Sequence, residues 1–337
     1  MPDGPAPRAT SYDVAREAGV SQSTVSRAFQ PRSPIPAPTR ARVFAAAERL
    51  GYMPNALARS LITRRSDLIA VIATRYTLRF NPDVTHALGE SLNAAGKQLL
   101  LLTVEHDLPS PAALRRLLEY PLGGVISCVL LDEDSLGAMR RRGIPIVLYN
   151  RVMPGIGVDT VSANHEAASH QLAAMLYRAG HRRFLCMGGP ADAVVSRLRM
   201  HGALAYLGSV GAEQPHVIET DYSYAAGRAA FLAGTANHRP DAVICANDQI
   251  AMGVMDACRF DRRWRVPEDV SVVGFDDVAE AERPSYALTT MRQESVAMAH
   301  EAVRLLLART EVGGDRAVHV TIPACLMARG SARIATA

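Results

Sequence analysis

Four polar side chains near the N-terminus have the types and spacing needed to read a nucleic-acid groove. They are Gln22, Ser23, Ser26 and Arg27. Val25, Ala28 and Phe29 recur at helical spacing and should face inward, so the polar side chains point away from the packed side. Each can donate or accept hydrogen bonds, which is the chemistry that base edges in a major groove require. An ordinary capped helical hairpin with a solvated polar face would show the same pattern, and the segment alone leaves both interpretations open.

A short helix must precede this one to form a compact pair. Ser11 is a residue type that caps helices, and Gly19 supplies the positive φ that ends one. Ser21 then caps the helix that carries the polar side chains. The apolar stripe expected on the first helix consists of Val14, Ala15 and Ala18. The pattern therefore predicts two short amphipathic helices joined by a turn.

A third helix is predicted after the proline-rich connection "QPRSPIPAPTR". Pro38 lies where a first helical turn tolerates proline. The apolar face expected along "TRARVFAAAERLGY" consists of Val43, Ala46, Ala47 and Leu50. Three small helices would make a bundle near the lower size limit for independent folding.

The next stretch, "MPNALARSLITRRSD", has good helix propensity after Asn55, a capping residue type. A helix this short is marginal in water and should order only with a partner. One interpretation is a linker with a single frayed turn. The other is a hinge helix that forms on DNA, with Leu61 as an apolar wedge between base steps and Arg59 near the backbone.

Charge is distributed unevenly along the chain. Residues 1–64 contain nine arginines and four acidic residues, a formal charge of +5, whereas the remainder carries −1. A basic N-terminal segment on a nearly neutral body predicts a polyanionic partner for that segment alone.

The composition is that of a globular protein with ample core. Of 337 residues, 48% are hydrophobic and 21% are charged. No stretch reaches the roughly 20 apolar residues that cross a bilayer, and residues 1–9 lack the pattern of a signal peptide, which predicts a cytoplasmic protein. Five scattered cysteines without a CxxC pair favour buried reduced thiols over disulfides or zinc ligands.

From Asp67 onward, short runs that are apolar throughout alternate with helical segments, as in parallel sheets buried on both faces. A first series comprises "LIAVIA" (68–73), "LLLLTV" (99–104), "GGVISCVLL" (123–131) and "IPIVLY" (144–149), with helices such as 84–95 and 111–119 between. A second series begins near residue 158 and comprises "VDTVSA", "RFLCMGG", "HVIET", "DAVICA" and "VSVVGFDD". The pattern predicts a doubly wound α/β architecture used twice, with ligands outside the carboxyl ends of the strands.

From about residue 10 to 330 the chain resembles the lactose repressor (LacI/GalR) family of bacterial transcription regulators. The motifs are "YDVAREAGVSQSTVSR", "ERLGYMPNALARSL", "LYRAGHRR", "GGPAD" with "SRLRMHG", "ANDQIAMGVMDA", "VPEDVSVVGFDD" and "LTTMRQ". The resemblance implies a disordered tail (1–9), a three-helix helix-turn-helix domain (10–54), a hinge helix and linker (55–66) and an effector-binding and dimerisation domain (67–337). That last domain would consist of two α/β subdomains of the periplasmic-binding-protein type.

The resemblance implies a repressor that binds a palindromic DNA operator as a homodimer and needs no cofactor or metal. Its base-reading positions would be Gln22, Ser23 and Arg27, and Leu61 falls on the minor-groove leucine. The full set of expected DNA-binding residues is Tyr12, Ser21, Gln22, Ser23, Thr24, Ser26, Arg27, Asn55, Ala58, Arg59 and Leu61. The chain ends without a heptad repeat, which resembles the dimeric members.

The resemblance also implies a small-molecule effector, a sugar or sugar acid, bound between the two subdomains. Arginine, asparagine and aspartate side chains suit adjacent hydroxyl groups, and an aromatic ring suits the apolar face of a sugar. The expected effector-binding residues are Arg75, Tyr76, Phe80, Asn150, Arg199, Tyr222, Asn247 and Asp276. For Asp276, which follows a strand directly, a plain turn residue is the alternative.

Two departures from the family pattern bear on the effector. Asn150 and Arg151 stand after "IVLY", where an aspartate is common. The usual asparagine-proline-aromatic signature after the first strand is altered to "FNPDV", and Arg75 lies near the end of that strand. Arginines with fewer acids would favour an anionic effector such as a sugar acid.

Two rival functions are an enzyme and a plain solute-binding protein. His165 and His170 in "NHEAASH" are five residues apart, whereas HExxH places its histidines four apart, so a solvated helix start is favoured over a zinc site. The sequence has no GxSxG, no GxxxxGK[ST] and no GxGxxG after a strand, so we expect no enzyme activity. The absent signal peptide and the basic front argue against a solute-binding protein.

Overall fold

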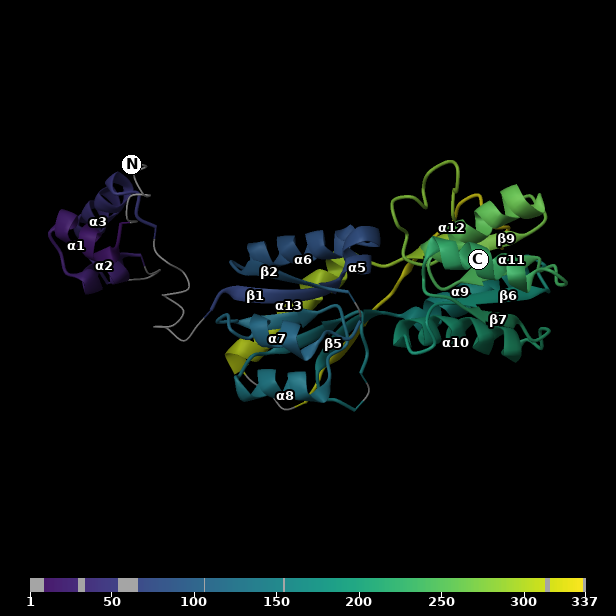
Figure 1. Ribbon diagram of the computed structural model, residues 1–337, viewed down its shortest axis with the longest axis horizontal. Helices are drawn as coiled ribbons and strands as arrows, with labels where there is room; N and C mark the ends of the chain where they lie inside the picture. Colours follow the sequence, from purple (N-terminus) through teal and green to yellow (C-terminus); the bar gives the residue numbers. More distant parts are fainter. Residues whose placement is uncertain are drawn as a thin grey trace, which may run out of the picture. The chain divides into compact units, whose positions relative to one another are not determined.

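A computed structural model describes residues 9–29, 34–53, 66–105, 107–153, 155–312 and 316–335 (Figure 1). The chain forms a helical unit up to Ser66 and an α/β unit from Asp67 onward. No helix among the described residues is both long and apolar enough to cross a membrane. Four cysteines are buried free thiols, and Cys325 is exposed.

The helical unit consists of α1 (Ser11–Ala18), α2 (Gln22–Ala28) and α3 (Ala37–Arg49). Its core is made of small and β-branched side chains that pack where the three helices meet. The buried residues are Val14, Ala15, Ala18, Val25, Ala28, Val43, Ala46 and Ala47, as the apolar spacing predicts. Leu50 was expected on the same face but is exposed, and Tyr52 packs against this core instead.

The caps of α1 and α2 explain where the turn begins and ends. Gly19 has φ 65° and closes α1, and the Ser21 hydroxyl accepts the Thr24 backbone N–H, as predicted. The expected cap at Ser11 is wrong, because Thr10 caps α1. Thr10 forms a reciprocal capping box with Asp13, which satisfies two helix-end donors.

The first sheet of the α/β unit has six parallel strands in the order β11-β5-β4-β3-β1-β2. They are β1 (Leu68–Thr74), β2 (Gln98–Val104), β3 (Gly124–Ser127), β4 (Ile146–Tyr149), β5 (Asp159–Ala163) and β11 (His319–Ile322). One face packs on α6 (Pro82–Ala94) and α13 (Ser295–Val312), and the other packs on α7 (Pro111–Leu117) and α8 (Glu133–Arg141) (Figure 1). The short α5 (Arg75–Phe80) follows β1.

The second sheet has four parallel strands in the order β7-β6-β8-β9. They are β6 (Phe184–Gly188), β7 (His216–Glu219), β8 (Ala242–Cys245) and β9 (Ser271–Val273). Its helices are α9 (His165–Arg178), α10 (Val194–Ser209), α11 (Tyr224–Gly234) and α12 (Asp248–Asp256), which continues as a π-helical turn over Ala257–Arg262. A separate antiparallel pair joins β10 (Thr290–Arg292) to β12 (Cys325–Met327).

The assignment of strands to sheets corrects the prediction at one point. The strand in "VDTVSA" was expected to open the second series, but β5 pairs with β4 in the first sheet, with Val147 opposite Asp159. The C-terminal α13 and β11 also return to the first sheet. An apolar run of this kind predicts a buried strand but does not indicate which sheet the strand joins. The hydrogen-bond pairing between strands decides that.

Candidate functional site

The polar face of α2 is open to a partner. Ser21, Ser23 and Arg27 are exposed, and Gln22 is half-buried. Within the described residues, the Arg27 side chain has no hydrogen-bond or ion-pair partner, so its guanidinium is available to an external acceptor. The Gln22 amide donates to the Ser11 hydroxyl at 3.3 Å, which fixes the start of α2 against α1.

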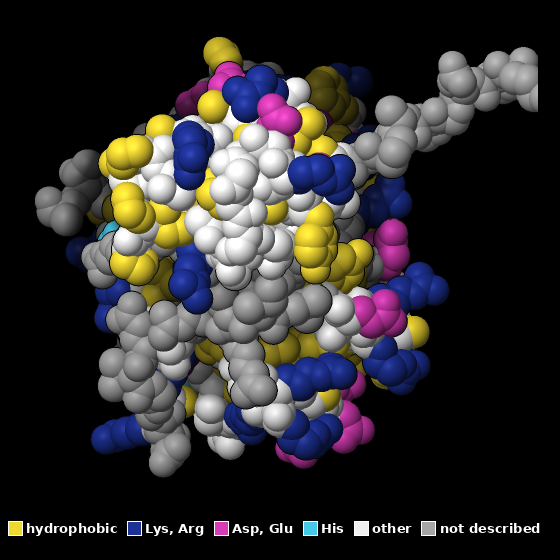
Figure 2. Space-filling model, turned by 90° about the vertical axis from the view of Figure 1, so that its left-hand side faces the viewer, with side chains coloured by type: hydrophobic (Ala, Val, Ile, Leu, Met, Phe, Trp, Pro, Cys, Tyr) yellow, Lys and Arg dark blue, Asp and Glu magenta, His cyan; other side chains and the backbone are white. Residues whose placement is uncertain are grey.

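The other predicted DNA-binding residues divide into two groups. Tyr12 is 69% exposed on α1, and Thr24 and Ser26 are half-buried on α2. On the face seen in Figure 2, Lys and Arg side chains lie scattered among hydrophobic and other uncharged side chains, with Asp and Glu beside some of them. Asn55, Ala58, Arg59 and Leu61 of the expected hinge helix lie outside the described residues.

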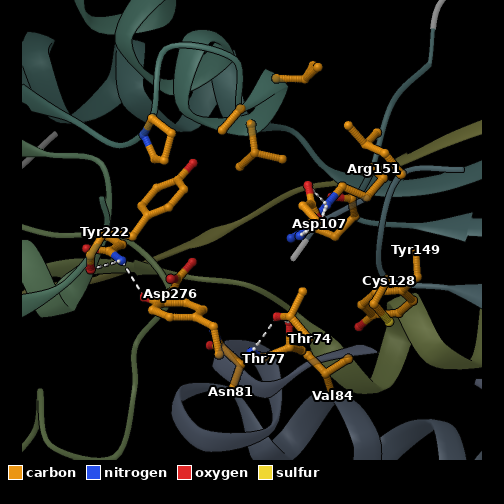
Figure 3. Close-up of a pocket in the computed structure, with 18 of the residues that line it drawn as sticks. Thr74, Thr77, Asn81, Val84, Asp107, Cys128, Tyr149, Arg151, Tyr222 and Asp276 are labelled. Carbon is orange, nitrogen blue, oxygen red and sulfur yellow. Dashed lines mark hydrogen bonds and ion pairs between the residues drawn. The ribbon is translucent and has the colours of Figure 1, made fainter. Parts of the chain in front are cut away.

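The α/β unit contains a cavity of about 660 Å³ lined by residues that follow strands of both sheets (Figure 3). Thr74, Tyr76 and Asn150 come from the first sheet, and Tyr222 and Asn247 come from the second. Thr74 is the last residue of β1, and the other positions follow β1, β4, β7 and β8, as expected for ligand sites at the carboxyl ends of parallel strands. The volume lies within the range of small-molecule sites.

One wall of the cavity joins the two sheets through Asn247. Its amide donates to the Tyr76 hydroxyl at 2.5 Å and to the Tyr222 carbonyl at 3.0 Å, and its oxygen caps α12 by accepting the Ile250 N–H. The Tyr76 and Tyr222 rings are 6.2 Å apart. Tyr222 has φ 70°, a left-handed backbone conformation that is uncommon for a large side chain. Two aromatic side chains and one amide therefore line this side of the cavity.

A buried ion pair lies next to Asn247. Arg199 on α10 is only 3% exposed, and its guanidinium contacts an Asp276 carboxylate oxygen at 2.8 Å. It also donates to the Ala246 carbonyl at 2.5 Å and lies over the Phe275 ring, 3.7 Å from the ring centroid. Gln293 donates to the same Asp276 oxygen at 2.6 Å. Asp276 is thus a member of a cavity wall, and the plain-turn alternative does not describe its contacts.

A second ion pair lies on the first-sheet side, where Figure 3 shows Arg151 beside Asp107. The Arg151 Nε donates to both Asp107 oxygens at 2.9 and 3.0 Å, and its Nη1 donates to the Asn150 carbonyl. Asp107 follows β2 and was not predicted as a site residue. Asp107 is not part of a recognised motif. It could be identified as a site residue only from the sheet order, which brings the ends of β2 and β4 to one cavity.

These pairs bear on the expectation of an anionic effector. Both arginines that line the cavity, Arg151 and Arg199, already face a carboxylate. The acidic residues of the lining outnumber them and are Glu105, Asp107, Asp192, Asp221 and Asp276. A ligand carboxylate would therefore meet a net negative lining.

Two predicted effector residues lie outside the cavity lining. Arg75 is exposed, and its guanidinium is 3.9 Å from Glu105. Phe80 packs on the Tyr76 ring with centroids 4.8 Å apart, so it supports a lining residue without lining the cavity. Arg75 is the first residue of α5 and its side chain is exposed. Phe80 lies one turn after Tyr76 on the same helix face and packs on the Tyr76 ring, which stands between it and the cavity.

His165 was expected at a solvated helix start and is instead buried. Its Nδ1 accepts from the Arg199 Nε at 3.3 Å, and its Nε2 lies 2.8 Å from the Asn150 amide oxygen. Burial and the nearby Arg199 hold its pKa well below the ordinary value of 6.5. Burial raises the pKa of Asp276 and of the Tyr76 hydroxyl, so both groups favour their uncharged forms more than in water. No group of three or more His, Cys, Asp or Glu residues suited to a metal ion occurs among the described residues.

The stability of the wild type relative to His165→Asn should depend on pH. Because the pKa of His165 is lowered in the folded state, below about pH 6.5 the unfolded chain binds a proton there that the folded chain does not. The wild type should therefore lose stability relative to the variant as the pH falls, by up to about 1.4 kcal/mol per pH unit. Urea unfolding at pH 8, 6 and 5 measures the difference, and a constant difference would contradict the buried neutral ring.

Comparison with known proteins relates both units to one class. Residues 10–55 match the family described as bacterial regulatory proteins, lacI family, and residues 173–332 match a periplasmic binding protein-like domain. The HTH-type transcriptional regulator CelR of Thermobifida fusca is 31% identical over 336 residues, 96% of this chain and 98% of that protein. The ribose operon repressor of Escherichia coli (strain K12) is 30% identical over 330 residues, 96% of this chain and 100% of that protein.

Solved structures give the same result. The lac repressor dimer bound to operator and the anti-inducer ONPF aligns with a TM-score of 0.86 at 28% identity, covering 96% of this chain and 99% of that one. The complex of the transcriptional regulator CelR with cellobiose aligns with a TM-score of 0.69 at 29% identity, covering 96% of this chain and 100% of that one.

Proposed function

Because the chain belongs to the LacI family of bacterial regulatory proteins, we propose that it is a dimeric repressor whose affinity for a palindromic operator is set by a small effector bound in the cavity of the α/β unit. The open polar face of α2 supports base reading by Gln22, Ser23 and Arg27. The sequence supports DNA contacts by the hinge segment, with Leu61 as a wedge between base steps and Arg59 near the backbone. The relatives are transcriptional regulators, which supports regulation rather than catalysis.

We further propose that the effector is a neutral polyhydroxylated molecule such as a sugar. The observation that carries this proposal is the pairing of Arg151 with Asp107 and of Arg199 with Asp276. Each pair offers donors and acceptors side by side, which suits adjacent hydroxyl groups without requiring a charged ligand. The Tyr76 and Tyr222 rings supply the apolar surface that the face of a sugar ring needs. The names of two relatives, a ribose operon repressor and a regulator solved with cellobiose, favour the same class.

Regulation would follow from linkage between effector and operator binding. An effector that contacts both sheets favours one relative orientation of the two, and that preference shifts the equilibrium of the hinge segments on DNA. Coupling of this kind is typically worth about 1–3 kcal/mol. Operator titrations with and without effector show whether the effector weakens or strengthens operator binding, which distinguishes an inducer from a co-repressor.

A thermal-shift screen of the full chain tests the effector class. Cellobiose and ribose represent neutral sugars, and gluconate represents the sugar acids that the sequence alone favoured. We expect a neutral sugar to raise the melting temperature in a saturable way and gluconate to leave it unchanged. Stabilisation by gluconate alone would reject the neutral class and restore the anionic one.

Replacing Arg27 with alanine should weaken operator binding by about 1–3 kcal/mol, because an exposed guanidinium on the open face of α2 is suited to a bidentate contact with guanine. Fluorescence anisotropy would compare an inverted-repeat duplex selected by the protein from a random library with an unselected duplex. Arg16→Ala, an exposed arginine on α1, is the matched control. An equal loss on both duplexes would make Arg27 a phosphate contact instead of a base reader.

A further inference from the structure

Five side chains form a closed circuit of hydrogen bonds behind and along the cavity wall. Arg199 donates to His165 at 3.3 Å, and His165 contacts the Asn150 oxygen at 2.8 Å. The Asn150 amide donates to the Gln293 oxygen at 2.8 Å, and the Gln293 amide donates to Asp276 at 2.6 Å. The bond from Arg199 to Asp276 at 2.8 Å closes the circuit. Every member therefore has a partner on each side.

The circuit permits one arrangement of protons. Arginine has no acceptor, so the His165 Nδ1 that faces Arg199 must carry a lone pair. The ring proton of a neutral histidine must then lie on Nε2, where it donates to the Asn150 oxygen. This orients the Asn150 amide as a donor to Gln293, and Gln293 as a donor to the carboxylate. The donors run in one direction from Arg199 to Asp276, so the tautomer of one buried ring determines both amide orientations.

The members come from both sheets. Asn150 follows β4 of the first sheet, whereas Arg199 on α10 and Asp276 after β9 belong to the second. Asn150 and Asp276 have φ of 53° and 117°, so the backbone at both is held in a conformation that their side-chain contacts help to maintain. His165 begins α9 and is the one member that does not line the cavity. His165 would therefore affect ligand binding only indirectly, by holding Arg199 and Asn150 in place.

We propose that His165 is a positioning residue of the effector site. Its neutral ring holds Arg199 toward Asp276 and the Asn150 amide toward Gln293. The ligand-binding groups of the two sheets thereby keep fixed positions relative to one another. The inference rests on the proposed function, because it takes the cavity as the effector site. It also assigns a role to Asn150: an aspartate there could not donate to the Gln293 oxygen and would interrupt the circuit.

Nuclear magnetic resonance of the full chain tests the circuit without any ligand. With ¹⁵N-labelled histidine at pH 7.5, the His165 ring, identified by its loss in His165→Asn, should carry its proton on Nε2. A slowly exchanging Arg199 Nε–H signal, identified by its loss in Arg199→Lys, should persist in His165→Asn, whose oxygen replaces Nδ1 as acceptor, and should disappear in His165→Leu. A proton on Nδ1, or an Arg199 signal unchanged in His165→Leu, would overturn the proposal.

Calorimetry with cellobiose as the probe tests the positioning role. We expect His165→Leu to weaken binding at least about tenfold and His165→Asn to weaken it less, because the asparagine restores one of the two hydrogen bonds. His170→Asn, on the exposed side of the same helix, is the matched control and should stay within about twofold. Affinity in folded His165→Leu equal to that of the control would overturn the positioning role. If the wild type does not bind cellobiose, the proposed effector class loses support, and the resonance experiment alone decides the role of His165.

Discussion

Replacing Arg199 with leucine should lower the free energy of unfolding of the α/β unit by about 3–5 kcal/mol. The substitution leaves the Asp276 carboxylate buried without the guanidinium that lies 2.8 Å away and removes the donor to the Ala246 carbonyl. Burial already raises the pKa of Asp276, and loss of the arginine should raise it further. The folded variant would then avoid the buried charge by binding a proton, so the loss should be larger at pH 8 than at pH 5. Urea unfolding at both pH values measures the effect.

Arg197→Leu is the matched control for this prediction. Arg197 lies on the same helix but is exposed, with one bond to the Ala191 carbonyl, so its loss should cost less than about 0.5 kcal/mol. Adding Asp276→Asn to Arg199→Leu should recover part of the stability, because no carboxylate is then left unpaired. Equal losses in the two arginine variants would mean that the buried ion pair contributes nothing to the fold.

Replacing Gly202 with alanine should cost about 3 kcal/mol. A Cβ atom at Gly202 on α10 would lie 2.1 Å from the Glu166 carbonyl oxygen on α9. This contact is with the backbone, so no side-chain rotation can relieve it and the two helices must separate. Glu166 follows His165 directly, so the separation should also lengthen the contact between His165 and Arg199. Thermal unfolding measures the stability, and the Arg199 Nε–H signal reports the site.

Gly208→Ala on the same helix separates this packing effect from helix propensity. A Cβ atom there meets nothing within 4 Å, so alanine should stabilise the helix by about 1 kcal/mol. The two glycine variants should therefore change stability in opposite directions. A Gly202→Ala variant as stable as Gly208→Ala would show that α9 and α10 can separate without cost.

The helical unit follows closely from its sequence because its signals are local. Gly19 and Ser21 mark the end of α1 and the start of α2, and the apolar spacing identifies the buried face of each helix. The N-cap of α1 was predicted at Ser11 and lies one residue earlier, at Thr10. Thr10 is favoured because it forms the two hydrogen bonds of a capping box with Asp13, whereas a capping hydroxyl alone forms one. Each of these interactions joins residues within a few positions of one another.

The candidate effector site could be predicted only in part. The family motifs placed Arg199, Asn247 and Asp276 in the site, and these residues line the cavity. They could not place Asp107, because its partner Arg151 lies 44 positions away and the two meet through the order of β2 and β4 in the sheet. The expectation of an anionic effector counted arginines without their partners, and such a count overstates the positive charge of the cavity.

By itself the sequence determined the class of the fold, the capped helical pair and the buried strands, because hydrophobic period and capping chemistry act over a few residues. Only the tertiary structure decided which sheet holds β5, which arginines are neutralised, and that a histidine expected in solvent is buried between Arg199 and Asn150. Such contacts span as many as 171 positions, as between Tyr76 and Asn247, and depend on the order of strands in a sheet. That strand order cannot be predicted from residue types and their spacing along the chain alone.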